Sequence, residues 1–188
     1  MIYVIDHKDS FTHNVVHQLS LFDEVECDNY NKVDKTKLNK AKVIVFSPGP
    51  GNPKNYPLTS KIYNQFKGKK KIIGICLGFQ QILFCEGAQI VEQNKIYHGY
   101  QSDIKVNSKN SLFKKNQIFK VGRYHSLKLK EPFKIKDFEI TMRCLESKVA
   151  MAFENYKDKI YGFQSVSYTH LRAHETRHDL VCRLLLEK

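Results

Sequence analysis

The chain has 188 residues, carries a formal net charge of +12, and contains 41% hydrophobic and 12% aromatic residues. This length is enough for one buried core and short for two, and the apolar content excludes an intrinsically disordered chain. No apolar run approaches the roughly 18–20 residues that cross a bilayer, so we expect no membrane association.

The positive charge does not indicate a nucleic-acid partner. The lysines are spread over the whole chain, and residues 1–164 contain only two arginines, Arg123 and Arg143. Arginine is the side chain that most often reads bases and binds phosphates with both arms of its guanidinium. We therefore expect no binding to DNA or RNA.

The cysteines and the N-terminus both favour a cytoplasmic protein. The five cysteines are odd in number and form no CxxC pair, which suits a reducing compartment better than a disulfide framework. The opening MIYVIDHKDS has no basic region and no cleavage site, so it is not typical of a signal peptide. We interpret it as the first strand of the fold.

The first half of the chain alternates apolar strands with helices. Continuous apolar runs predict strands over residues 2–5, 25–27, 43–46 and 72–75, and apolar residues at helical spacing predict helices over 11–19, 58–66 and 80–85. From about residue 96 the pattern alternates, over 104–106, 138–142, 149–153 and 160–163. Strands that are apolar throughout indicate a parallel sheet covered on both faces. We expect one three-layer α/β domain with a mostly parallel central sheet and an additional antiparallel portion.

A cysteine stands where the fourth predicted strand turns into a helix, in the stretch IIGICLGFQQILF at residues 72–84. In open α/β sheets ligands gather at the carboxyl ends of strands, and SPGPGNP at residues 47–53 ends the preceding strand. Glycines on both sides of Cys76 permit the strained turn of a nucleophile elbow. A helix N-terminus would lower the pKa of the thiol. The N–H groups of Leu77 and Gly51 could receive an oxyanion. The alternative is a buried cysteine that only fills a core turn.

Six motifs give the sequence a family resemblance. IDHKDSFTHNV, FSPGPGNP, GICLGFQ, HGYQS, GRYHSL and YGFQ occur in this order. Residues 1–164 thereby resemble a class I glutamine amidotransferase, with its flavodoxin-like three-layer fold. The opening I-D-x-x-D-S-F-T favours the small subunit, component II, of anthranilate synthase or aminodeoxychorismate synthase. The resemblance does not choose between these two syntheses.

The resemblance implies an activity, a partner and a set of site residues. Cys76 would attack the glutamine side-chain amide and form a thioester, with the oxyanion held by the Leu77 and Gly51 N–H groups. No cofactor is implied, and ammonia would pass to a chorismate-binding large synthase subunit. His125 would be structural, and His98 would lie near the subunit interface. Glutamine-binding positions would be Gly49, Pro50, Gly51, Gln80, Ser126 and Leu127.

The last 24 residues depart from the family pattern. The family supplies its general acid from a His-Pro-Glu tripeptide just after the strand that ends here at Gln164, and this sequence contains no such tripeptide. Basic residues also change, since residues 165–188 hold Arg172, Arg177 and Arg183 against Lys188 alone. We therefore expect residues 165–188 to be foreign to the amidotransferase domain, and the chain as written to turn over poorly.

The same tail offers two alternatives. His174, Glu175 and His178 match H-E-x-x-H, a helical zinc motif of metalloproteases, and His170 adds a third imidazole at helical spacing. A zinc-binding or metalloprotease-like function is therefore the competing hypothesis. His170 or His174 could also replace the missing histidine, but His170 is six residues past Gln164 where the family places its histidine two residues on.

Overall fold

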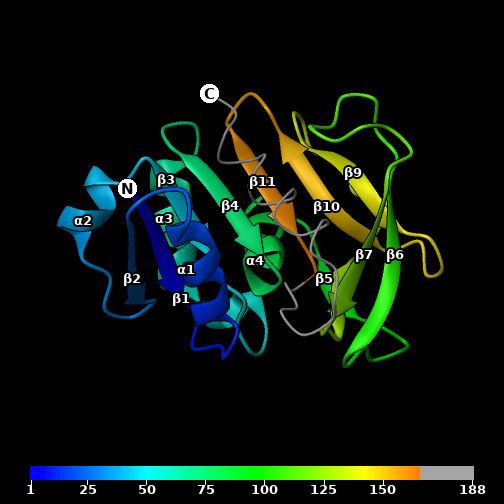
Figure 1. Ribbon diagram of the computed structural model, residues 1–188, viewed down its shortest axis with the longest axis horizontal. Helices are drawn as coiled ribbons and strands as arrows, with labels where there is room; N and C mark the ends of the chain where they lie inside the picture. The colour runs from blue at the N-terminus through cyan, green and yellow to red at the C-terminus, as the bar shows by residue number, and fades with distance from the viewer. Residues whose placement is uncertain (166–188) are drawn as a thin grey trace.

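A computed structural model describes residues 1–165 of the chain. Within these residues the main feature is a nine-stranded sheet in the order β2-β1-β3-β4-β11-β10-β9-β6-β7 (Figure 1). The strands of this sheet are β1 (Ile2–Asp6), β2 (Val25–Asn29), β3 (Val43–Phe46), β4 (Lys71–Ile75), β6 (Tyr100–Val106), β7 (Ile118–Arg123), β9 (Glu139–Cys144), β10 (Ala150–Asn155) and β11 (Ile160–Phe163). The helices are α1 (Thr12–Ser20), α2 (Lys35–Lys40), the short 3-10 helix η1 (Pro53–Asn55), α3 (Pro57–Phe66) and α4 (Leu77–Cys85).

The parallel half of the sheet consists of β2, β1, β3, β4 and β11. Successive residues of β1 enter two different cores, with Ile2 and Val4 packing toward α1 and Tyr3 and Ile5 packing toward α2, α3 and α4. This alternation is what a strand buried on both faces requires. The half-sheet is therefore the middle of three layers, with helices in front of it and behind it (Figure 1).

The antiparallel half continues the same sheet from β11. Strand β11 pairs parallel with β4 on one side and antiparallel with β10 on the other, and β9, β6 and β7 follow in antiparallel pairs. A separate two-stranded sheet joins β5 (Ile90–Glu92) to β8 (Leu127–Leu129). The predicted mixed architecture is confirmed, and β11 is the strand at which the pairing changes direction.

Several elements lie where the sequence predicts them, while others were missed. Strand β3 has the predicted bounds, and β1, β4 and α3 differ from prediction by one residue at one end. Helix α4 begins at Leu77, three residues before the predicted start, so the helix follows the cysteine directly. Helix α2 and strands β5, β7 and β8 were not predicted. Helix α2 has six residues and one buried side chain, too little for an apolar period to show.

Candidate active site

The turn from β4 to α4 holds Cys76 in a strained backbone conformation. Its φ of 54° and ψ of −102° lie in a region that residues with a side chain rarely adopt. A Cβ on Gly74 would lie 2.5 Å from the carbonyl carbon of Gly78, and one on Gly78 would lie 2.2 Å from the Phe46 carbonyl oxygen. Both flanking glycines are therefore needed for the close packing of helix against sheet, as a nucleophile elbow requires.

The Cys76 thiol is buried and has two hydrogen-bond donors beside it. Its residue is 8% exposed, and its backbone N–H donates to the Phe163 carbonyl at 2.8 Å. The Leu77 backbone N–H and the Gln164 side-chain amide both approach the sulfur, with the Gln164 nitrogen 3.8 Å from Sγ. Gln164 follows the last residue of β11, so the element next to β4 supplies this contact.

The predicted low pKa of Cys76 is wrong. Burial raises the pKa of the Cys76 thiol to about 12, and the negative charge of Asp9 raises it further. The Leu77 N–H and the Gln164 amide lower the pKa, but they do not offset the loss of water around the sulfur. The thiol at this helix N-terminus is therefore protonated near neutral pH.

Gln80 lies one helical turn after the thiol and faces the same region. Its side-chain nitrogen donates to the Gln164 side-chain oxygen at 3.0 Å and lies 3.5 Å from the Leu127 carbonyl. Gln164 therefore accepts from Gln80 with its oxygen and directs its nitrogen at Cys76. Sequence reasoning missed Gln164, which it used only as the end of the YGFQ motif.

The SPGPG loop after β3 lies against the residue next to the thiol. A Cβ on Gly49 would lie 2.4 Å from the Leu77 side chain and 2.5 Å from the Cβ of His7. The Tyr56 hydroxyl donates to the Pro50 carbonyl at 2.8 Å, and Gly51 is exposed with a φ of 78° that favours glycine. The loop is thus fixed at Gly49 and Pro50, the two residues before the predicted oxyanion residue Gly51.

His7 packs against this loop, and sequence reasoning missed it as well. It is fully buried, and its backbone N–H donates to the Ser47 hydroxyl at 2.9 Å. Its ring Nε2 lies 3.0 Å from the Thr59 hydroxyl oxygen. Burial lowers the pKa of His7 to about 4, so the imidazole is neutral at physiological pH. A histidine in a turn between strand and helix is not distinguishable in sequence from a solvated one.

The segment His125–Leu127 completes the region. His125 is 4% exposed, Ser126 is exposed, and the Leu127 carbonyl faces Gln80. His98 is exposed, with its ring 5.6 Å from that of Tyr124. The structure therefore brings Cys76, Leu77, Gln80 and Leu127 together at the carboxyl end of β4.

Comparison with known proteins identifies the family. The model of the family "Glutamine amidotransferase class-I" matches residues 3–165. The chain belongs to this family. Anthranilate synthase component 2 of Lactococcus lactis is 37% identical over 168 residues, which cover 87% of this chain and 84% of that protein. Aminodeoxychorismate/anthranilate synthase component 2 of Bacillus subtilis is 30% identical over 167 residues, covering 87% and 86%.

Solved structures agree on the fold of this amidotransferase. A glutamine amidotransferase from Methylobacillus flagellatus superposes with a TM-score of 0.71 at 14% identity, covering 88% of this chain and 68% of that one. Within residues 1–165, none of the helices has the length and hydropathy needed to cross a membrane.

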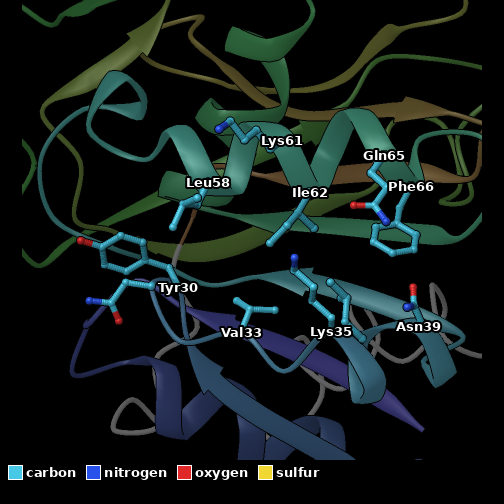
Figure 2. A pocket seen from close by; sticks show the side chains of 11 residues that line it. Tyr30, Val33, Lys35, Asn39, Leu58, Lys61, Ile62, Gln65 and Phe66 are labelled. Carbon is cyan, nitrogen blue, oxygen red and sulfur yellow. The ribbon is translucent and has the colours of Figure 1, made fainter.

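A hollow of the amidotransferase lies away from the thiol, between α2 and α3 (Figure 2). Its cavity volume is about 440 Å³, and Ile62 of α3 and Lys35 of α2 point toward one another across it. It is lined by Tyr30, Asn31, Val33, Lys35, Leu38, Asn39, Leu58, Lys61, Ile62, Gln65 and Phe66. This lining contains no predicted site residue, so the hollow is separate from the candidate active site.

The tail motifs fall outside the part of the amidotransferase that the structure describes. This applies to the H-E-x-x-H match at His174, Glu175 and His178, and to the replacement histidine sought in His170 or His174. Residues 1–165 contain no group of three or more histidine, cysteine or acidic side chains that could hold a metal ion. No observation favours the zinc hypothesis.

Proposed function

We propose that this chain is the glutaminase subunit of an anthranilate or aminodeoxychorismate synthase, with residues 1–164 as the amidotransferase domain. The observation that carries the proposal is the strained backbone of Cys76, which presents a thiol at the carboxyl end of β4 between two amide donors. A buried cysteine that only fills space would have no need of a positive φ. The two relatives reported above, both named component 2, support the same assignment.

In the proposed reaction the Cys76 sulfur attacks the side-chain amide carbon of glutamine. The carbonyl oxygen takes up negative charge, which the backbone N–H groups of Leu77 and Gly51 receive. The carbon–nitrogen bond then breaks, the thiol proton leaves with the nitrogen as ammonia, and a glutamyl thioester remains on Cys76. Water hydrolyses the thioester to glutamate and restores the thiol.

We assign the remaining site residues the roles that the family resemblance implies. Gln80 and the backbone of Ser126 and Leu127 would bind the substrate's α-amino and α-carboxylate groups, and Gly49 and Pro50 would shape the oxyanion loop. The contact of Gln80 with both Gln164 and the Leu127 carbonyl supports this arrangement, because it joins the thiol to the substrate segment. Leaving Cys76 protonated until substrate binds would protect the free enzyme from oxidation.

The proposed partner is a large synthase subunit that binds chorismate and takes up the ammonia. Cys27, Cys76, Cys85 and Cys144 are free thiols, which supports a place in the reducing cytoplasm. The Bacillus subtilis relative carries both synthase names, so the same small subunit could serve either partner. Mixing the purified chain with each type of large subunit, and measuring anthranilate and aminodeoxychorismate, decides between them.

A glutamine-mimicking alkylator tests the nucleophile. We expect the reagent to label Cys76 and no other cysteine, with free glutamine protecting it, and Cys76→Ser to abolish the labelling. Labelling that avoids Cys76 would refute the proposed function. Replacing residues 165–188 by a family-type ending with His-Pro-Glu should raise glutamine turnover, because the leaving ammonia then has its proton donor.

A further inference from the structure

Arg123 is a buried cation whose described partners include no carboxylate. It is 0% exposed and is the largest fully buried side chain within residues 1–165. The centre of its guanidinium lies 3.5 Å from the middle of the Tyr97 ring, and one terminal nitrogen donates to the Ser147 hydroxyl at 3.2 Å. Burying a charge without an opposite charge is costly, so such a residue is retained where its fixed donors have a use.

The first use of these donors is to fix the tautomer of His125. The Arg123 Nε donates to His125 Nε2 at 3.0 Å, and an arginine nitrogen cannot accept a hydrogen bond. Nε2 must therefore carry the lone pair, and the ring proton lies on Nδ1, which donates to the Leu127 carbonyl at 2.8 Å. Gln93 Nε2 also lies 2.8 Å from Nδ1, but a ring accepting at both nitrogens would be an anion, so that contact is not a hydrogen bond.

The second use is to orient Gln93. Another terminal nitrogen of Arg123 donates to the Gln93 side-chain oxygen at 3.1 Å, which turns the Gln93 amide nitrogen toward the His125 carbonyl at 2.9 Å. The backbone N–H of Gln93 donates to the Ser126 carbonyl at 2.8 Å. The carbonyls of three consecutive residues, His125, Ser126 and Leu127, are thus all bound by Gln93 or His125, the two residues whose side chains accept from Arg123.

We propose that Arg123 is a positioning residue for glutamine, acting through His125 and Gln93. It holds the backbone of His125–Leu127 in one conformation, so that the groups facing the substrate are in place before glutamine binds. The Leu127 carbonyl also lies 3.5 Å from the Gln80 nitrogen, which links the segment to the thiol side of the site. This inference rests on the proposed function, because it assigns the segment to glutamine binding.

Arg123→Lys tests the inference, since lysine keeps the charge but cannot donate to His125, Gln93 and Ser147 at once. The rate of Cys76 alkylation is measured against the concentration of the glutamine-mimicking alkylator. We expect the half-saturating concentration to rise about tenfold while the maximal rate changes less than about threefold. Arg143→Lys is the matched control, because Arg143 lies on β9, whereas Arg123 is on β7, and it is a partly exposed arginine paired with Glu131. This variant should leave both values unchanged.

A second pair of variants keeps the inference testable if Arg123→Lys does not fold. His125→Gln retains an acceptor and a donor, whereas His125→Phe keeps a ring of similar size without either. We expect half-saturation within about threefold of the parent for His125→Gln and about tenfold weaker for His125→Phe. Equal values for the two variants would overturn the inference.

Imidazole nitrogen NMR gives a readout that does not depend on activity. In the parent chain we expect His125 as the Nδ1–H tautomer, and in Arg123→Lys a mixture of tautomers. An unchanged tautomer with unchanged half-saturation would show that Arg123 only fills the core. If Cys76 of the parent is never labelled, the proposed function itself fails, and the NMR result still reports on Arg123.

Discussion

The side-chain nitrogen of Gln164 lies 3.8 Å from the Cys76 sulfur, while the Gln164 oxygen accepts from Gln80 at 3.0 Å. Two neighbouring strands and one helix therefore meet at a single fully buried amide. This amide orders the side chains around the thiol and partly counters the desolvation of a thiolate.

Removal of this amide should slow the first chemical step. For Gln164→Leu we expect Cys76 alkylation by the glutamine mimic to fall about tenfold in maximal rate, because a developing negative charge on sulfur loses a donor and Gln80 loses its anchor. Gln101→Leu, at an exposed position of β6, is the control. Equal rates in the two variants would show that Gln164 serves packing alone.

The raised pKa of Cys76 predicts a distinct pH dependence. With a pKa of about 12, the thiolate fraction falls tenfold for each pH unit below that value, so alkylation by a small reagent such as iodoacetamide should still be rising at pH 9. A plateau near pH 7 would contradict this and restore the low pKa that the helix N-terminus suggested. The measurement uses the free enzyme, since bound glutamine would change the surroundings of the sulfur.

Much of the fold was predictable because the parallel strands are apolar throughout. The runs at β1, β3 and β4 contain consecutive residues that enter both cores, and no other pattern would satisfy a strand covered on both faces. Strand β7 was missed because its inward residues, Phe119, Val121 and Arg123, include a charged side chain, and charge is normally a sign of exposure.

The site was predictable where its backbone geometry requires a particular residue type. Gly74 and Gly78 enclose Cys76 because only glycine allows the approach of helix to sheet, and that requirement is visible as G-x-C-x-G. Gln164 and His7 belong to no such sequence pattern, since an amide or an imidazole can stand at many positions in a fold. The pKa of Cys76 was predicted in the wrong direction because sequence shows the helix end but not the depth of burial.

The lowered pKa of His7 predicts that the folded chain loses stability in acid. Its pKa is about 4 in the folded chain against an ordinary value of 6.5, so the unfolded chain binds more protons between these values. The contribution of neutral His7 to the free energy of unfolding is therefore fully present above pH 6.5 and is lost as the pH falls toward 4. The loss is up to about 1.4 kcal/mol for each pH unit. Denaturant titrations at pH 7 and pH 5 measure this change.

His7→Gln should flatten the acid dependence of stability, whatever its effect at pH 7. Part of the slope remains in this variant, because burial and the nearby Arg123 also lower the pKa of His125 to about 4. His13→Gln, at an exposed position of α1, should follow the parent at both pH values. If His7→Gln keeps the full parental slope, another group is responsible for it.

Gly78→Ala adds only one methyl group, but we expect it to disrupt the turn that presents Cys76. The added Cβ would lie 2.2 Å from the Phe46 carbonyl oxygen and 2.8 Å from the Phe46 carbonyl carbon, and these backbone atoms cannot turn aside as a flexible side chain could. Helix α4 would have to shift away from β3, carrying Leu77 and its N–H from the position that receives the oxyanion. We expect Cys76 alkylation by the glutamine mimic to be lost and the free energy of unfolding to fall by about 2 kcal/mol or more.

Gly87→Ala separates this steric effect from the general cost of replacing a glycine. Gly87 has a φ of 85° just past α4, and a Cβ there would meet nothing within 4 Å, so the change costs only backbone strain of about 1 kcal/mol. Helix α4 keeps its place against β3, and alkylation should proceed at the parental rate. Were both variants to lose labelling alike, the close contact of Gly78 with Phe46 could not be what presents the thiol, because only Gly78 makes that contact.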